Sequence, residues 1–285
     1  MIVFILIISI ASIPLAVGLC ALIFGKRHAA GTGPTGLLFH GITSRQFTHF
    51  SYFPPEKFTL FIEAIVRQKT VTSTLKEAMS DDATKALVIT FDDGFQNFYT
   101  QAFPVLEAHS IKVTLFPIAG FIGRSSAWDV LPRQEHLNKT QLREISDQGH
   151  EIGSHTMSHA NLTLLRTSDV EQELRDSKIM IEDITGKPVN SLSFPFGSWN
   201  KRVWEIAQNV GYTQATGYRN HGRGQRGILP VCGVYSYDTI EDVLDKVFSN
   251  ARFLNSVTRA RVTSHFSKGT PLWKFRKNYM IAPKH

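Results

Sequence analysis

Short apolar runs alternate with longer amphipathic stretches along most of the chain. The runs 37–40, 86–89, 112–117 and 191–194 are short enough to be buried strands, and 86–89 is apolar and partly β-branched. Segments between them place apolar residues at helical spacing, most clearly over 55–67. Strands that alternate with helices in this way predict βαβ units and a parallel sheet.

The rest of the pattern is typical of an α/β barrel. Predicted helices cover 95–109, 141–148, 168–186, 200–210 and 240–248, and predicted short strands cover 150–154, 213–216, 228–234 and 260–264. Thr140 is placed to cap the helix 141–148, and Gly149 to end it. Roughly six to eight βα units in about 250 residues fit a closed or nearly closed barrel, whose strand carboxyl ends meet at one face. We expect at this face the residues that directly follow predicted strands: His40, Asp92, Asp93, His155 and Phe196.

The amino terminus is a long uncharged segment. Residues 2–24 carry no charge, and about 20 apolar residues suffice to span a bilayer. The segment lacks the basic start and the shorter apolar region of a cleavable signal peptide. We therefore predict a single-pass membrane anchor over 1–25, a Gly- and Pro-containing linker over 26–36, and one folded domain over 37–285. Lys26 and Arg27 directly follow the anchor, and the positive-inside tendency would place them in the cytoplasm.

Composition and charge narrow the range of molecules that the protein is expected to bind. Of the residues, 42% are hydrophobic and 19% charged, which suits a globular domain with a sizeable core. The formal net charge of +7 is concentrated in 251–285, which has no acidic residue. This basic segment is either a solvated face or a contact for anionic lipid head groups or an anionic glycan. No recognisable nucleic-acid motif accompanies the charge, so we expect no nucleic-acid partner. The oligomeric state stays open. The segment's basic residues are Arg252, Arg259, Arg261, Lys268, Lys274, Arg276, Lys277 and Lys284.

Two adjacent carboxylates, Asp92 and Asp93, follow the strand 86–89 and precede Gly94. Glycine permits a sharp turn, and a turn would let both side chains reach one pocket. Two like charges there repel, and both persist only if a cation or strong hydrogen bonds hold them. The alternative is an ordinary surface turn, for which Asp-Asp-Gly is common chemistry.

Two histidines, His155 and His159, are spaced at i and i+4 after a predicted strand. On a helical turn their Cβ atoms would lie about 6 Å apart, a spacing that a metal can bridge. One carboxylate from the Asp92-Asp93 pair would complete a His-His-carboxylate set with an open position for water. Such a set suits zinc or another divalent first-row ion. The second aspartate would then be available to accept a proton.

On these residues the chain resembles the polysaccharide deacetylases, the NodB-homology domain of carbohydrate esterase family four. Thr90–Gly94 matches the first motif of the family, Ser154–His159 the second, and Ser193–Gly197 resembles the third. The resemblance extends over 37–216. It implies a distorted (β/α) barrel of about seven parallel strands.

The resemblance also implies roles for particular residues. Asp92 would be the general base of a metal-dependent hydrolase that removes N-acetyl groups from amino-sugar glycans. The metal would most often be Zn2+, although Co2+ or another first-row ion fits. The backbone N–H of Phe196 would face the developing oxyanion, and Trp199 could stack on a sugar ring. The implied metal ligands are Asp93, His155 and His159, and the implied oxyanion and substrate-binding residues are Pro195, Phe196, Gly197 and Trp199.

Two departures from the family pattern have one explanation. Ser193 stands where the third motif usually has an arginine that orients the catalytic aspartate, and no Leu-x-His motif is evident at the expected downstream place. A branch that includes poly-N-acetylglucosamine deacetylases is permuted: an early strand supplies the acid histidine, and the third motif lacks arginine. Leu38-Phe39-His40 fits that branch, so His40 is the preferred general acid, ahead of His221 and His265.

Other functions remain open from the sequence. The same chemistry would serve a deacylase or deformylase of a lipid-linked amino sugar, to which an anchor and a basic segment are suited. A glycan-binding module with a decayed site is a third possibility, kept open by Ser193. The family implies a domain facing the cell envelope, whereas Lys26 and Arg27 favour the cytoplasmic side.

Overall fold

The computed structural model describes residues 35–44, 51–80, 86–126, 134–218 and 225–248. The predicted anchor (1–25), most of the predicted linker, the basic segment and the predicted strand 260–264 lie outside these ranges. Within them, no helix is both long enough and apolar enough to cross a membrane. The first strand begins at Thr35, two residues before the predicted start of the domain.

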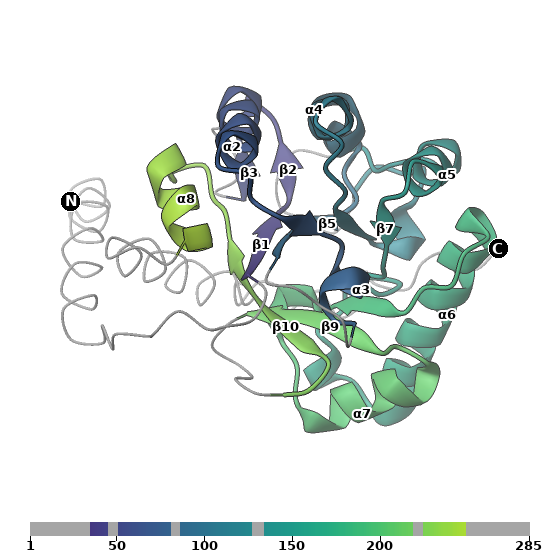
Figure 1. Cartoon of the computed structure of the whole chain (residues 1–285). Helices are drawn as coiled ribbons and strands as arrows, with labels where there is room; N and C mark the ends of the chain where they lie inside the picture. The colour runs from purple at the N-terminus through teal and green to yellow at the C-terminus, as the bar shows by residue number, and fades with distance from the viewer. Residues whose placement is uncertain (1–34, 45–50, 81–85, 127–133, 219–224, 249–285) are drawn as a thin grey trace, which may run out of the picture.

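An all-parallel sheet curls into a nearly closed barrel (Figure 1). Its strands run in the order β7-β6-β5-β1-β10-β9-β8, and β4 pairs with the beginning of β5. Ser154, just after β7, forms a parallel bridge with Leu192 of β8 and so joins the two ends of the order. This confirms the predicted barrel of about seven parallel strands. The strands are β1 (Thr35–Phe39), β4 (Thr72–Ser73), β5 (Leu87–Asp93), β6 (Thr114–Pro117), β7 (Glu151–Ile152), β8 (Ser191–Ser193), β9 (Gln214–Tyr218) and β10 (Ile228–Gly233).

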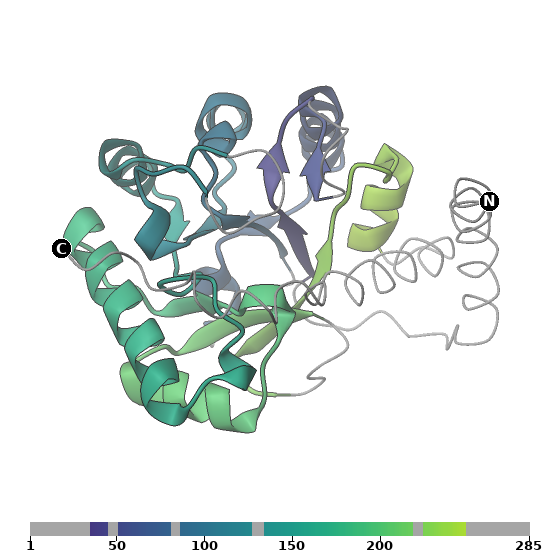
Figure 2. The ribbon, with the colours of Figure 1, turned by 180° about the vertical axis from the view of Figure 1, so that it is seen from behind.

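Helices surround the strands, as the two opposite views show (Figures 1 and 2). Their inward faces supply the core between helices and sheet, for example Phe58, Phe61 and Ile65 of α2. The helices are α2 (Pro55–Arg67), α3 (Leu75–Ala78), α4 (Phe103–Ala108), α5 (Lys139–Asp147), α6 (Thr167–Thr185), α7 (Lys201–Val210) and α8 (Ile240–Phe248). Short 3-10 turns lie at η2 (Ala119–Phe121), η3 (Leu162–Leu164) and η4 (Pro195–Gly197).

The amino-terminal end of the barrel is closed by α3 and by a polar cluster. Leu75 of α3 packs inside the barrel with Val88, Phe116 and Leu229. Beside this plug, the carboxylate of Glu151 accepts hydrogen bonds from the hydroxyls of Thr114 and Ser191 and from the backbone N–H of Lys76. The bonds satisfy a carboxylate that would be costly to bury alone. The barrel is therefore filled at this end, and its chemistry gathers at the other.

Helix ends agree with the sequence at two places and differ at one. Gly186 ends α6 in the left-handed conformation, and the side chain of Asn200 caps α7. The predicted cap Thr140 is wrong: Asn138 caps α5, accepting from the N–H of Gln141 at 2.9 Å while Gln141 accepts from Asn138. This reciprocal capping box begins the helix at Lys139, two residues earlier than predicted.

The predicted helix 95–109 divides into two parts. A π-helical segment, η1 (Phe98–Ala102), precedes α4, and the N–H of Phe103 donates to the carbonyl of Phe98. Pro104 lacks an N–H and so cannot make the next bond of a regular helix. The short parallel pair β2 (Gly41–Ile42) and β3 (Tyr52–Phe53) was not predicted, because two residues carry no periodicity.

An aromatic cluster joins β1 to β5 beneath the site. The rings of Phe39 and Phe91 are neighbours in the strand register and stack at 5.4 Å. Phe58 packs edge-on against both, and Phe98 packs edge-on against Phe91 at 4.7 Å. Close aromatic packing of this kind fixes the two strands relative to each other. The residue that follows Phe39, His40, is thereby held beside Asp92.

Candidate metal centre and catalytic site

The candidate site lies at the carboxyl end of the barrel. Asp92 and Asp93 end β5, His40 directly follows β1, His155 and His159 follow β7, and Ser193 ends β8. Both aspartates, His155, His159 and Ser193 are buried, and His40 is partly exposed. The barrel thus brings together the residues that the sequence placed after separate strands.

A left-handed turn lets both carboxylates face one pocket. Asp93 has a φ of 69°, and Gly94 follows with 70°. A Cβ on Gly94 would lie 2.8 Å from the Cα of Pro117, so glycine is needed both for the turn and for this close approach. His136 supports the turn, because its Nδ1 lies 2.9 Å from the backbone oxygen of Asp93.

Asp93, His155 and His159 form a set of possible metal ligands. Oδ1 of Asp93 lies 3.7 Å from Nε2 of His155 and 3.7 Å from Nε2 of His159. One ligand atom from each residue lies within 4.8 Å of the other two. Ligands bound tetrahedrally at 2.0–2.1 Å would be roughly 3.3–3.5 Å apart, so a small contraction would satisfy zinc. Two imidazoles and one carboxylate leave a coordination position open for substrate or water.

Hydrogen bonding and burial prepare the imidazoles for a metal. Nδ1 of His155 lies 2.8 Å from the backbone oxygen of Ser193, so the N–H donates there and the Nε2 lone pair faces Asp93. Burial lowers the pKa of His155 to about 4. Burial, together with the charges of His155, His40 and His136, lowers the pKa of His159 well below its usual value. Both rings are therefore neutral at pH 7, as metal ligation requires.

The loop that carries the two histidines is not a helical turn, and this part of the sequence-based prediction is wrong. Thr156 and His159 both have positive φ angles, 67° and 61°. The hydroxyl of Thr156 accepts from the backbone N–H of His159 at 3.1 Å and closes the loop. The rings of His155 and His159 nevertheless converge, with centroids 4.8 Å apart.

Asp92 lies beside the ligand set and has a different partner. Its Oδ2 accepts from the hydroxyl of Ser193 at 2.9 Å and lies 3.8 Å from Nε2 of His155. Burial and the charge of Asp93 raise the pKa of Asp92 well above its usual range, and the Ser193 hydrogen bond offsets part of this rise. A cation bound at Asp93 would relieve the repulsion between the two carboxylates. The Ser193 hydroxyl thus holds Asp92 at the place where the resemblance would lead one to expect an arginine.

His40 reaches the site from β1. Leu38 and Phe39 pair with Thr90 and Phe91, so His40 comes level with Asp92. Its charge contributes to the lowered pKa of His159, which places the two imidazoles near each other. The other candidate acids, His221 and His265, lie outside the described ranges.

The Pro-Phe-Gly turn also borders the site. Phe196 has a φ of 59°, and its ring packs edge-on against His159 at 4.7 Å. Trp199, predicted to meet sugar, stacks on the buried ring of Phe194 at 5.9 Å and is partly buried. It packs so closely over Gly217 that a Cβ there would lie 2.8 Å from the indole nitrogen. Contacts with Phe194 and Gly217 thus cover much of the surface of the Trp199 side chain.

Sequence reasoning missed His136. The residue is buried, and its ring lies against Phe121 and Phe95 at 5.4 and 5.0 Å. Burial lowers its pKa to about 4, and its contact with the Asp93 carbonyl opposes that shift. His136 belongs to an irregular segment that pairs with Phe95 through a single bridge. Neither a motif nor a periodicity could have identified it.

Comparison with known proteins agrees with this fold. The model of the family described as polysaccharide deacetylase matches residues 80–215. A putative polysaccharide deacetylase of Bacillus subtilis, YxkH, is 29% identical over 62% of this chain and 61% of its own length. The peptidoglycan-N-acetylmuramic acid deacetylase PdaA of B. subtilis is 30% identical over 45% of this chain and 44% of its own. The chain thus spans less than two thirds of the length of these relatives.

The solved structure of the deacetylase PplD of Streptococcus pyogenes, in complex with acetate, has the same fold. It aligns with a TM-score of 0.67 and 20% identity, covering 76% of this chain and 99% of PplD. The match to the family model, the curated relatives and the parallel barrel together show that this chain is similar to the polysaccharide deacetylases. Deacetylases of this family are hydrolases that act on N-acetyl amide bonds of carbohydrates.

Proposed function

We propose that this chain is a metal-dependent deacetylase that removes N-acetyl groups from an amino-sugar glycan. The observation that carries the proposal is the division of labour between adjacent aspartates. Asp93 lies with His155 and His159 as a set of three ligand atoms. Asp92 lies beside them on a hydrogen bond from Ser193. A glycan-binding module would need neither the ligand set nor a second, separately held carboxylate.

The chain's own residues suit each part of amide hydrolysis. A divalent ion, most often zinc in an N,N,O set, polarises a carbonyl and lowers the pKa of water. Asp92, held by Ser193, accepts the proton of the attacking water. His40, entering from the neighbouring strand, returns a proton to the departing amine. The backbone N–H of Phe196, in the turn against His159, is assigned to the developing oxyanion.

The activity is tested by acetate release. Purified full-length protein is incubated with chitooligosaccharides, poly-N-acetylglucosamine and peptidoglycan, and acetate is measured before chelation, after chelation and after zinc is restored. We expect release that chelation abolishes and zinc recovers. Asp92→Asn should retain zinc but lose most of the rate. Glycan binding without acetate release, unchanged in Asp92→Asn, would instead support the binding module.

The anchor is a separate part of the proposal and rests on the sequence. Residues 2–24 would hold the domain at a membrane, and the family resemblance favours the envelope side. A compartment-sensitive reporter fused after His285 tests this. Signal on the envelope side supports the proposal, and signal in the cytoplasm would favour the orientation indicated by Lys26 and Arg27.

A further inference from the structure

The loop between the two histidines has an unfavourable backbone. Thr156 and His159 occupy the left-handed region although neither is glycine. Such conformations persist only where surrounding contacts over-determine them. The contacts that hold this loop therefore decide whether His155 and His159 keep the spacing that a metal requires.

Glu173 of α6 holds the middle of the loop. One carboxylate oxygen, Oε2, accepts from the backbone N–H groups of Met157 and Ser158 at 3.0 and 2.9 Å. The other, Oε1, accepts from the hydroxyl of Ser158 at 2.6 Å. All three donors come from the two residues between Thr156 and His159. Three hydrogen bonds to one side chain hold the middle of the loop against α6, and their geometry depends on how far that side chain reaches.

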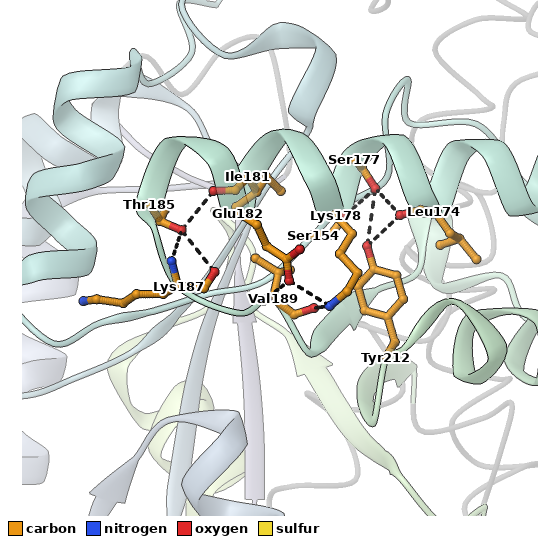
Figure 3. A network of polar contacts seen from close by, with 10 residues as sticks. All are labelled: Ser154, Leu174, Ser177, Lys178, Ile181, Glu182, Thr185, Lys187, Val189 and Tyr212. Atoms are coloured by element: carbon orange, nitrogen blue, oxygen red, sulfur yellow. Dashed lines mark hydrogen bonds and ion pairs between the residues drawn. The ribbon is translucent and has the colours of Figure 1, made fainter.

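The same face of α6 holds the start of the loop. The backbone N–H of Thr156 donates to the hydroxyl of Ser154 at 3.1 Å, and that hydroxyl donates to Ser177 at 2.9 Å. Ser177 donates in turn to the carbonyl of Leu174, which also accepts from the hydroxyl of Tyr212 (Figure 3). Ser177 lies four residues after Glu173 and thus on the same side of the helix.

We propose that Glu173 is a positioning residue for the metal centre. Its carboxylate is bonded to the backbone between the histidines and fixes the loop in the conformation in which both imidazoles face Asp93. This inference rests on the proposed metal site, because it explains how that site is held in shape. Supporting groups around metal ligands typically contribute about 10–100-fold to metal affinity.

Two substitutions distinguish the effect of the length of the Glu173 side chain from the effect of its charge. Glu173→Gln keeps the length of the side chain and an oxygen for the two backbone N–H groups but removes the charge. Glu173→Asp keeps the charge and shortens the reach by one methylene. Zinc affinity of the full-length protein is measured by competition with a chromophoric chelator. If Glu173 acts by holding the loop, Glu173→Asp weakens zinc binding about 10–100-fold, and Glu173→Gln stays within a few-fold of wild type.

The matched controls are Glu171→Gln and Glu171→Asp. Glu171 belongs to the same helix, its side chain is 43% exposed, and its partner is Arg175. Neither substitution should change zinc affinity. The reverse order at position 173, with Asp retaining affinity and Gln losing it, would show that charge attraction matters rather than position, and would overturn the proposal. Unchanged affinity in both variants would also overturn it.

A second measurement needs no metal. Amide hydrogen exchange of metal-free protein should accelerate at Met157 and Ser158 in Glu173→Asp and stay unchanged in the Glu171 variants. Wild-type protein that binds no zinc would refute the proposed function, and the exchange rates would still report whether Glu173 holds the loop. Wild-type exchange at both amides in Glu173→Asp would refute the positioning role while leaving the proposed function intact.

Discussion

Replacing Ser193 with alanine removes one hydroxyl from the centre of the site. Among the residues that the structure describes, that hydroxyl is the hydrogen-bond donor to the Asp92 carboxylate, at 2.9 Å, and Oδ1 of Asp92 is buried without a partner. The backbone carbonyl of Ser193, which accepts from His155, is retained in the variant. Ser193→Ala therefore releases the proposed base while leaving the ligand orientation in place.

The magnitude follows from the kind of hydrogen bond. A bond to a charged group is worth about 1.5–3 kcal/mol, and each 1.36 kcal/mol of transition-state stabilisation changes a rate tenfold. If the hydrogen bond from Ser193 contributes this free energy to the transition state, its loss should lower kcat about 10–150-fold. Because the hydroxyl contacts the base and not a metal ligand, KM and zinc content should change little.

The assay is steady-state acetate release together with metal analysis of the same preparation. Ser193→Thr is the control, since it keeps the hydroxyl on a β-branched residue suited to a strand, and it should recover much of the lost kcat. An unfolding curve in urea for each variant separates a local effect from a loss of folded protein.

Two outcomes would refute the reasoning. If Ser193→Ala keeps kcat within twofold of wild type, the hydroxyl does not steady the base and Asp92 is held by other means. If the variant loses zinc in proportion to its rate, Ser193 acts through the metal ligands instead.

Three further predictions address the rest of the site. His40→Ala should retain zinc and lose about 10²–10⁴-fold in kcat if His40 is the general acid; full activity would exclude that role. Gly94→Ala should lower the free energy of unfolding by at least about 1 kcal/mol in urea titrations, because φ is 70° and a Cβ would lie 2.8 Å from Pro117; an unchanged midpoint would contradict the turn. Burial lowers the pKa of His136 to about 4, so between pH 6.5 and 4 the unfolded chain binds the proton that the folded chain excludes. In metal-free protein His136 should therefore account for a loss of up to about 3 kcal/mol as the pH falls through this window, and His136→Gln should lose less than wild type by about this amount; equal pH dependence would count against a buried neutral His136.

The sequence predicted the convergence of the site because that property depends on topology alone. Parallel strands place their carboxyl ends together, so Asp92, Asp93 and His155 had to meet once the strands were recognised. His40 followed from its position after β1, and β1 lies directly beside β5. These inferences needed strand type and order but no side-chain detail.

The local backbone geometry of the site was harder to predict from the sequence. An i, i+4 pair of histidines is typical of a helical turn, yet here the spacing is spanned by a loop with left-handed Thr156 and His159. A non-glycine residue with positive φ leaves no reliable trace in composition, because the contacts that enforce it come from elsewhere in the chain. Those contacts come from Glu173, 14 residues beyond His159 and on another element. The same limit explains why His136 was missed.

The absence of the usual arginine was the strongest argument for a decayed site, and the structure supplies a different account. Ser193 ends β8, directly beside the bridge that closes the barrel at Ser154, so both of its polar groups face the site. Its hydroxyl donates to Asp92 and its carbonyl accepts from His155. One small residue thus links the proposed base, through its side chain, to a proposed metal ligand, through its backbone carbonyl. A buried guanidinium would lower the pKa of Asp92 strongly, while a neutral hydroxyl orients it at less cost to its basicity. A serine at this place is therefore consistent with an active general base.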